Sequence, residues 1–544
     1  MRAAAILLAL LAALPALAEP AVYILDGGGK SIARVDVSRG AIQAKELLPF
    51  TDDATDVLAA PDGKRLVVLS AGQRRAFNAS AAIVDAATMT ASPRIDLGRG
   101  LGDTAFAPDG KSLLVLSPGS GGIPGTLYRI DLASAAVSKR LPLDRVADRF
   151  AIVGDDAGVV LQKGGKNANG RVSFVSLAAL EVTATVDLGG KVSELVEIPG
   201  SGYLYAIETN AVDVISLAER KLVNRVTVGK DAKLGGIDEA TGSLFVLGTN
   251  EQRNGMLYVL RGAALAGSIN AGTGAPETFR LTADGKRALV GNTRGVTAVS
   301  LAPELAGGPT AALFSGFLAN SMRTIDDVAT PDGRRVFLLM RQYDKCCTLG
   351  IADPQEARTV ATLQVGKTSR RVAQALLSLA ATAASYSTAR ADAKAHGRGS
   401  FYYSVYSPAA ANNPRGAFAF GPDARTIYVL DSGTDVVTAV DVETGKRLAQ
   451  LDAPSAVGEV MLLGGRTIVA TGAKGLTLID SATNAVAESV DLDGDLRDVV
   501  ILPDQATALA LSKGRVTVID GRAAKTTARI AGLADPVAVV LLGR

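Results

Sequence analysis

The stretch Arg415–Pro454, RGAFAFGPDARTIYVLDSGTDVVTAVDVETGKRLAQLDAP, reads as four short β-strands joined by turns. Apolar residues alternate along its segments, which gives each strand a face to bury. Pro422-Asp423 and Thr444-Gly445 mark hairpin turns, because proline presets φ and glycine accepts positive φ. The stretch therefore predicts a four-stranded antiparallel unit.

The same unit recurs along the chain with drift. Related stretches are VLAAPDGKRLVVLSAG from Val57, TAFAPDGKSLLVLSPG from Thr104, LTADGKRALVGN from Leu281, DVATPDGRRVFLLMR from Asp327 and DVVILPDQATALALSKGRVTVIDGRAAKTTARI from Asp498. We count about eleven units at a period of roughly 40 residues, which is typical of β-propeller blades with four strands each.

The repeat resembles that of the bacterial YVTN-type β-propeller family. The best-matching copy has Tyr428-Val429-Leu430-Asp431 after Pro422-Asp423, followed by Val440-Asp441 and Thr444-Gly445-Lys446. The resemblance extends over nearly the whole chain after its N-terminal leader, although only this copy and the Pro-Asp-Gly copies match closely. It implies a fold, and it does not imply one particular activity.

The sequence thus predicts an all-β protein, a β-propeller of four-stranded blades in residues 19–366 and 415–544. About eleven units exceed the four to eight blades of a typical ring, so two adjoining propellers are favoured over one unusually wide ring. The final segment, DPVAVVLLGR, is a lone strand. We expect it to complete the blade that begins with AVYILDGGG, because closure removes two unpaired edges.

Residues 367–414 interrupt the repeat with a predicted helix and a tyrosine-rich loop. No proline or glycine occurs in the helical part before Gly397, and Val372, Leu376 and Leu379 share one helical face. His396 lies near the expected helix C-terminus, where a cation suits the helix dipole.

The tyrosine-rich loop is a candidate binding patch. It contains Phe401, Tyr402, Tyr403 and Tyr406. Long insertions on rigid scaffolds often carry function, and tyrosine offers rigid contact area with a polar tip. Simple packing of the insertion on the ring is an equally good interpretation of this cluster.

The stretch MRQYDKCCTLG, Met340–Gly350, contains the two cysteines of the chain, Cys346 and Cys347. It reads as the loop between the second and third strands of a blade. Such loops open on the same face as the links between blades, so we expect the cysteines, Arg341, Lys345 and the insertion to share one face, the candidate binding face. Adjacent cysteines in an oxidising compartment can form a disulfide. Loop stiffening, a reactive or ligand-contacting role, and free thiols all remain open.

The N-terminus predicts export. MRAAAILLALLAALPALAEP has the short basic start, short apolar core and Ala16-Leu17-Ala18 site of a secretory signal peptide over residues 1–18. No later apolar run is long enough to span a bilayer. We therefore expect an exported protein, periplasmic in a Gram-negative cell.

Composition excludes some classes of function. The chain has 57 Lys and Arg against 54 Asp and Glu, so its charges nearly balance. Nucleic-acid binding depends on clustered positive charge, and no nucleic-acid partner is expected. One histidine and two adjacent cysteines do not supply the spaced ligands of a zinc site, and no Cys-x-x-Cys-His sequence attaches haem. We expect no metal site and assign no cofactor.

No catalytic set is recognisable, and no Gly-x-Ser-x-Gly sequence marks a nucleophile. The sequence favours a non-catalytic binding or scaffolding protein that recognises a protein or small-molecule ligand in the periplasm. The alternative is a periplasmic propeller enzyme, either a lactonase-like hydrolase or a dehydrogenase-associated subunit.

Overall fold

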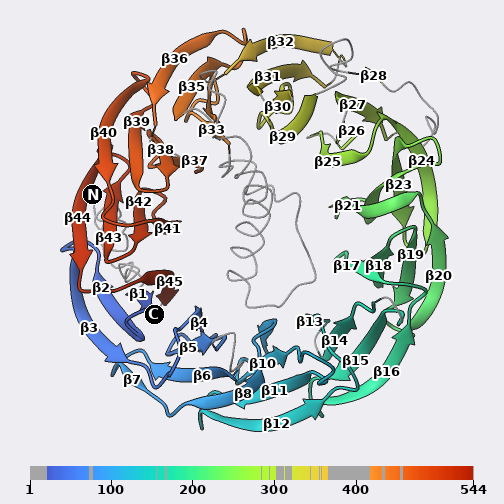
Figure 1. The fold of residues 1–544 in the computed structure, drawn as a ribbon, viewed down its shortest axis with the longest axis vertical. Helices are drawn as coiled ribbons and strands as arrows, with labels where there is room; N and C mark the ends of the chain where they lie inside the picture. The colour runs from blue at the N-terminus through green and yellow to red at the C-terminus, as the bar shows by residue number, and fades with distance from the viewer. Residues whose placement is uncertain are drawn as a thin grey trace, which may run out of the picture.

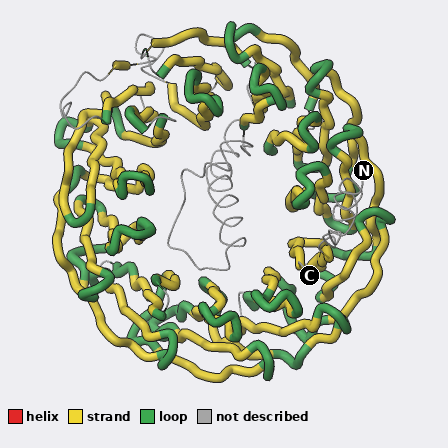
Figure 2. The backbone as a smooth tube through the Cα atoms, turned by 180° about the vertical axis from the view of Figure 1, so that it is seen from behind, coloured by secondary structure: helices red, strands yellow, loops and turns green. Residues whose placement is uncertain are grey.

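The structure is a computed structural model of the whole chain. It describes residues 21–72, 78–154, 156–165, 168–282, 285–292, 295–301, 311–312, 322–342, 345–354, 356, 358–365, 417–431, 435–453 and 458–542. Strands and loops make up these ranges, without a helix (Figure 2). The predicted helix in 367–414 and the predicted leader in 1–18 lie outside them.

The strands form eleven antiparallel sheets arranged as blades of one closed ring (Figure 1). The predicted all-β propeller of four-stranded blades is confirmed. The preference for two adjoining propellers is wrong, because successive blades continue around one ring and meet once, at the chain ends. Each blade of a repeat architecture packs only on its neighbours. The angle between adjacent sheets therefore sets the size of the ring.

We number the blades along the chain and give strands from the inner to the outer edge. Blades 1 to 4 are β45 (Pro536–Leu542), β1 (Ala21–Asp26), β2 (Ser31–Asp36), β3 (Ala41–Leu47); β4 (Asp56–Ala59), β5 (Arg65–Ser70), β6 (Asn78–Asp85), β7 (Thr90–Ala91) with β8 (Ile95–Arg99); β9 (Thr104–Phe106), β10 (Ser112–Ser117), β11 (Thr126–Asp131), β12 (Ala136–Pro142); and β13 (Arg149–Val153), β14 (Ala157–Gln162), β15 (Arg171–Ser176), β16 (Glu181–Asp187).

Blades 5 to 8 are β17 (Val192–Glu197), β18 (Tyr203–Glu208), β19 (Ala211–Ser216), β20 (Lys221–Thr227); β21 (Lys230–Asp238), β22 (Ser243–Thr249), β23 (Asn254–Arg261), β24 (Ala264–Thr273); β25 (Pro276–Leu281), β26 (Arg287–Asn292), β27 (Gly295–Ser300), β28 (Ala311–Ala312); and β29 (Met322–Ala329), β30 (Val336–Gln342), β31 (Lys345–Asp353), β32 (Arg358–Gln364).

Blades 9 to 11 are β33 (Phe418–Phe420), β34 (Thr426–Asp431), β35 (Val436–Asp441), β36 (Arg447–Asp452); β37 (Val460–Leu463), β38 (Thr467–Gly472), β39 (Gly475–Asp480), β40 (Ala485–Asp491); and β41 (Leu496–Ile501), β42 (Thr507–Ser512), β43 (Arg515–Asp520), β44 (Lys525–Ala531).

The antiparallel order gives the ring two different faces. Loops between second and third strands, and links from one blade to the next, open on one face, which we call the loop face. Turns between first and second strands and between third and fourth strands open on the other, the turn face.

Burial follows the position of a strand in its blade. Second and third strands are covered on both sides by neighbouring blades, and β10, β19 and β38 are buried at every residue. Fourth strands lie on the perimeter and alternate in exposure, as in β3. In nine blades the register between the third and fourth strands shifts at a bulge. Bulges twist an exposed edge and hinder pairing with other chains.

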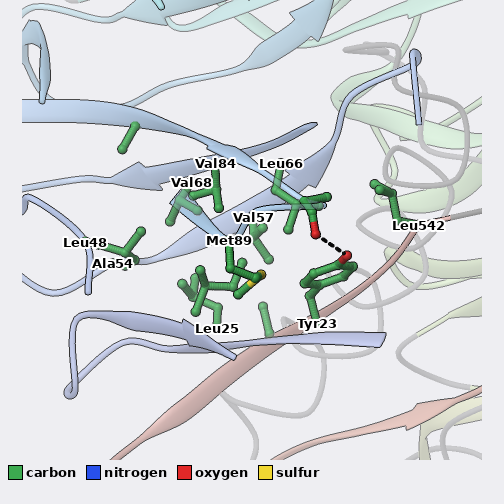
Figure 3. Packing of buried hydrophobic residues seen from close by; sticks show 14 of the residues in the cluster. Tyr23, Leu25, Leu48, Ala54, Val57, Leu66, Val68, Val84, Met89 and Leu542 are labelled. Atoms are coloured by element: carbon green, nitrogen blue, oxygen red, sulfur yellow. Dashed lines mark hydrogen bonds between the residues drawn. The ribbon is translucent and has the colours of Figure 1, made fainter. Parts of the chain in front are cut away.

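The ring closes where β45 pairs with β1, so the last described strand is the inner strand of the first blade. The seam with blade 2 is apolar, with Tyr23, Leu25, Val68 and Leu542 packed together (Figure 3). The Tyr23 hydroxyl donates to the carbonyl of Ala86 at 3.1 Å. Tyrosines at the same position in β18 and β34 also reach a turn of the following blade.

The described ranges contain no helix long and apolar enough to cross a membrane.

Candidate functional site

Most residues singled out by the sequence lie beyond what the structure describes. Five are outside the described ranges, namely His396, Phe401, Tyr402, Tyr403 and Tyr406. Three more have a described backbone in β30 or β31 while their side chains are outside the described part, namely Arg341, Lys345 and Cys346. Cys347 is the predicted site residue whose side chain the structure describes.

The cysteines belong to a strand, and their expected place in a loop is wrong. Gln342 already pairs with Lys345, so the connection between β30 and β31 is only residues 343–344. Cys346 and Cys347 are therefore early residues of the third strand of blade 8. Both remain at the loop-face end of that strand.

Cys347 is disulfide-bonded and 1% exposed. Its side chain belongs to an apolar cluster between blades 8 and 9 that includes Phe337, Val365 and Phe418. Val365 directly precedes residues 366–416, and Phe418 opens the strand that follows them. The cysteine thus lies beside both ends of that segment.

The return of the chain at Ala417 is held by blade 8. The N–H of Ala417 donates to Oδ2 of Asp326 at 3.1 Å, and the N–H of Asp327 donates to Oδ1 at 2.8 Å. Burial and the charge of Asp327 raise the pKa of Asp326 to about 6, against the lowering effects of the Ala417 hydrogen bond and of Arg280. Arg280 of blade 7 pairs with Asp327.

A row of carboxylates lies at the loop-face end of the inner strands. In six blades an acidic residue stands opposite a residue near the end of the second strand: Asp56, Asp103, Glu194, Asp326, Glu459 and Asp498. Some of these groups join neighbouring blades. Oδ2 of Asp103 accepts from Arg149 Nε and from the N–H of Phe150, both at 2.8 Å.

A second row of polar groups was not anticipated from the sequence. In blades 1 to 7 the last residue of the second strand is buried and hydrogen-bonds to the link that precedes its own inner strand, or to a strand next to that link. We call these seven residues the link latches: Asp26, Ser70, Ser117, Gln162, Glu208, Thr249 and Asn292. The signal was a polar residue closing an apolar run, as in LVVLS and LLVLS.

The link latch of blade 5 consists of charged side chains. Glu208 and Asp213 have side chains 2% and 0% exposed, and both pair with Arg225, at 2.6 Å and 2.7 Å. The N–H of Gly189 donates to Asp213 and that of Gly190 to Glu208, each at 2.8 Å. Burial raises the pKa of Asp213, and the adjacent Glu208 raises it further, while Gly189 and Arg225 oppose the shift.

On the turn face, in contrast, aspartates accept the backbone N–H groups of their own turns. In seven blades the carboxylate that ends the third strand accepts backbone N–H groups of the next turn: Asp36, Asp85, Asp131, Asp353, Asp441, Asp480 and Asp520. The turn N–H groups of Thr88 and Ser134 hold the pKa of Asp85 and Asp131 below the usual value. In these seven blades the described turns of this face are short and internally bonded.

No group of three or more metal-ligating side chains comes together within the described residues. The partnered carboxylates of the loop face accept hydrogen bonds from backbone N–H groups, from guanidinium groups and, at Asp144, from the amide of Gln162.

Comparison with known proteins supports the fold alone. No family model and no curated protein matches the chain. A "Crystal structure of the eukaryotic initiation factor" aligns over 97% of this chain and 99% of that chain, with 11% identity and a TM-score of 0.46. The dihydro-heme d1 dehydrogenase NirN in complex with DHE covers 72% of this chain and 75% of its own, with 14% identity and a TM-score of 0.37.

Hydrazine synthase of Kuenenia stuttgartiensis aligns over 57% of this chain and 94% of that chain, with 14% identity and a TM-score of 0.31. These are distant matches to propeller proteins, and at such scores they carry no argument about function. The chain is a β-propeller repeat protein without a family assignment.

Proposed function

We propose that this protein is an exported, periplasmic propeller of the YVTN type that binds a partner or ligand on its loop face without catalysing a reaction. The recognition elements are the insertion 367–414 with Phe401, Tyr402, Tyr403 and Tyr406, together with His396, Arg341 and Lys345. In this role no segment of the chain spans a membrane once the leader has been removed.

One observation carries the proposal, namely the difference between the two faces. In seven blades the described turns of the turn face are short and are closed by the aspartate that ends the third strand. The long segment 366–416 leaves blade 8 after Val365 and returns at Ala417, and both of these flanking residues lie at the loop face. A rigid ring that keeps one face plain and elaborates the other follows the pattern of scaffolds whose loops carry recognition.

The test compares one variant on each face. The chain with Tyr402, Tyr403 and Tyr406 replaced by Ala should fold normally, as judged by its thermal midpoint, and should lose the partner that cross-links to the wild-type protein in periplasmic extract. The control carries Lys64→Glu and Arg334→Glu, two exposed positions on the turn face, and should keep that partner.

Equal cross-linking by both variants would overturn the proposal. Unfolding of the triple variant would show that the tyrosines are core residues. A quinone or a metal ion that remains bound through purification would favour the dehydrogenase-associated or hydrolase alternative.

A further inference from the structure

The last rung between the third and fourth strands repeats around the ring. In six blades the residue after the fourth strand donates its N–H to the residue that precedes the third strand, with Leu48, Leu143, Leu188, Val228, Ala453 and Leu492 as donors. In blade 8 the donor is Val365 and the acceptor is the carbonyl of Cys347, with an N to O distance of 3.0 Å. Cys347 therefore occupies the acceptor position of the last rung, which six other blades also have.

The rung of blade 8 has extra bonds. The N–H of Cys347 donates back to the carbonyl of Val365 at 3.2 Å, and Nε2 of Gln364 donates to the Cys347 carbonyl at 3.1 Å. Both Cys347 and Val365 are buried, at 1% and 0% exposure. This reinforced rung is the last pairing that the structure describes before residue 366.

Cys347, one of the two residues of this rung, also forms a covalent bond. Cys347 is disulfide-bonded, and the sequence contains one other cysteine, Cys346. A bond between neighbouring residues restricts the backbone of both, and the end of a strand ladder is otherwise the place where pairing opens first.

We propose that the Cys346–Cys347 disulfide is a redox-sensitive lock on the Cys347–Val365 rung of blade 8. A dithiol reductant opens it in two exchanges. One thiolate attacks a sulfur to give a mixed disulfide, and the second thiolate resolves it. The two cysteines take up two electrons and two protons and become thiols, and the reductant becomes a disulfide. Without the disulfide, the backbone of the two cysteines is less restricted, so the Cys347–Val365 rung opens more often. The chain is then held less firmly where it leaves blade 8.

This inference does not depend on the proposed function, and the test needs no partner. Alkylation of the denatured, unreduced full-length protein should label neither cysteine, and its intact mass should be about two daltons below that of the reduced form. Amide hydrogen exchange of the peptide containing Val365 should then accelerate about tenfold on reduction. The peptide containing Leu188 has the equivalent rung with Gly170 at 2.9 Å and should not change.

The variant Cys346→Ser should show the fast exchange at Val365 without any reductant. If that variant does not fold, native reduction of the wild-type protein gives the same comparison. Alkylation of both cysteines before reduction would overturn the proposal, because no disulfide would exist. Unchanged exchange at Val365 after complete reduction would overturn it as well, because the disulfide would not control the rung.

Discussion

Blades 1 and 5 fix their links with a buried carboxylate at the same strand position, but they balance its charge differently. Asp26 stands alone, and its oxygens accept the N–H groups of Gly29, Ala534 and Asp535 at 3.0, 2.9 and 2.7 Å. The amine of Lys45 lies 3.6 Å away. In blade 5, Glu208 is joined by a second buried acid, and both rely on one arginine, whose side chain is 38% exposed.

The difference shows what each latch requires. A carboxylate surrounded by N–H donors is compensated by hydrogen bonds to its charged form, which suits the one place where the ring must close. Two buried acids that share one guanidinium leave an uncompensated negative charge, so their stability depends on the arginine and on protons. The latch residues of the five other blades are neutral, and four of them bond to backbone carbonyls, whereas Gln162 donates to the carboxylate of Asp144.

The largest expected effect comes from breaking the closure latch. Asp26→Ala removes the acceptor for three backbone donors that the closed ring holds around a fully buried side chain. Loss of one partner from a buried charged set costs about 3 to 5 kcal/mol. The urea unfolding midpoint measures the loss, with Thr249→Val as the matched change at a neutral latch. A midpoint no lower than that of the control would show that β45 pairing alone closes the ring.

Removal of the arginine from blade 5 should have the second-largest effect. Arg225→Met leaves Glu208 and Asp213 buried without their cation, and we expect a loss of about 2 to 3 kcal/mol at pH 7, reduced by the partial exposure of the arginine. The loss should be smaller at mildly acidic pH, because protonation of Asp213 relieves the repulsion. Lys221→Met on the same strand, where both partners of the ion pair are exposed, is the control. A loss that does not change with pH would contradict this account.

Asp213→Asn tests the proton dependence directly. The folded pKa of Asp213 is raised, so its contribution to stability is fully present below the unfolded value of about 4 and is lost as pH rises through the folded pKa. The variant lacks this titration. The unfolding free energy of the wild type relative to the variant should therefore be greatest at low pH and should decrease toward neutrality. A difference that is constant with pH would assign the proton to another group.

The local physics of the repeat allowed the sequence to predict the blades. Pro-Asp-Gly turns and alternating apolar runs specify hairpins, and the period near 40 residues specifies four strands per unit. The number of rings could not be read in this way. Whether blade 11 contacts blade 1 or an earlier blade depends on the angle between sheets, which no short stretch encodes.

The cysteines and the latches show the same limit at single residues. The position of Cys347 depends on where the hairpin of β30 and β31 closes. Because Gln342 pairs with Lys345, both cysteines lie in a strand and not in the expected loop. The buried role of Ser70 depends on a link from the preceding blade, 17 residues away at Asp53. Polar residues at strand ends look like ordinary turn residues until that link is in place.

The smallest effect separates a neutral latch from a serine that is merely buried. Ser70 and Ser512 both end a second strand and are 0% exposed. The hydroxyl of Ser70 donates to the link at Asp53 at 2.9 Å, whereas that of Ser512 donates within its own hairpin to Arg515 at 3.2 Å. Each change to Ala should cost about 1 kcal/mol, the usual contribution of one hydrogen bond.

Hydrogen exchange distinguishes the two serines where stability does not. Ser70→Ala should accelerate exchange at Thr55, whose N–H donates to Leu69 at the end of the link, because the link loses its attachment. Ser512→Ala should leave the link before β41 unchanged, since no bond from that serine reaches it among the described residues. Equal acceleration in both links would mean that burial of the strand end, and not the latch hydrogen bond, holds one blade to the next.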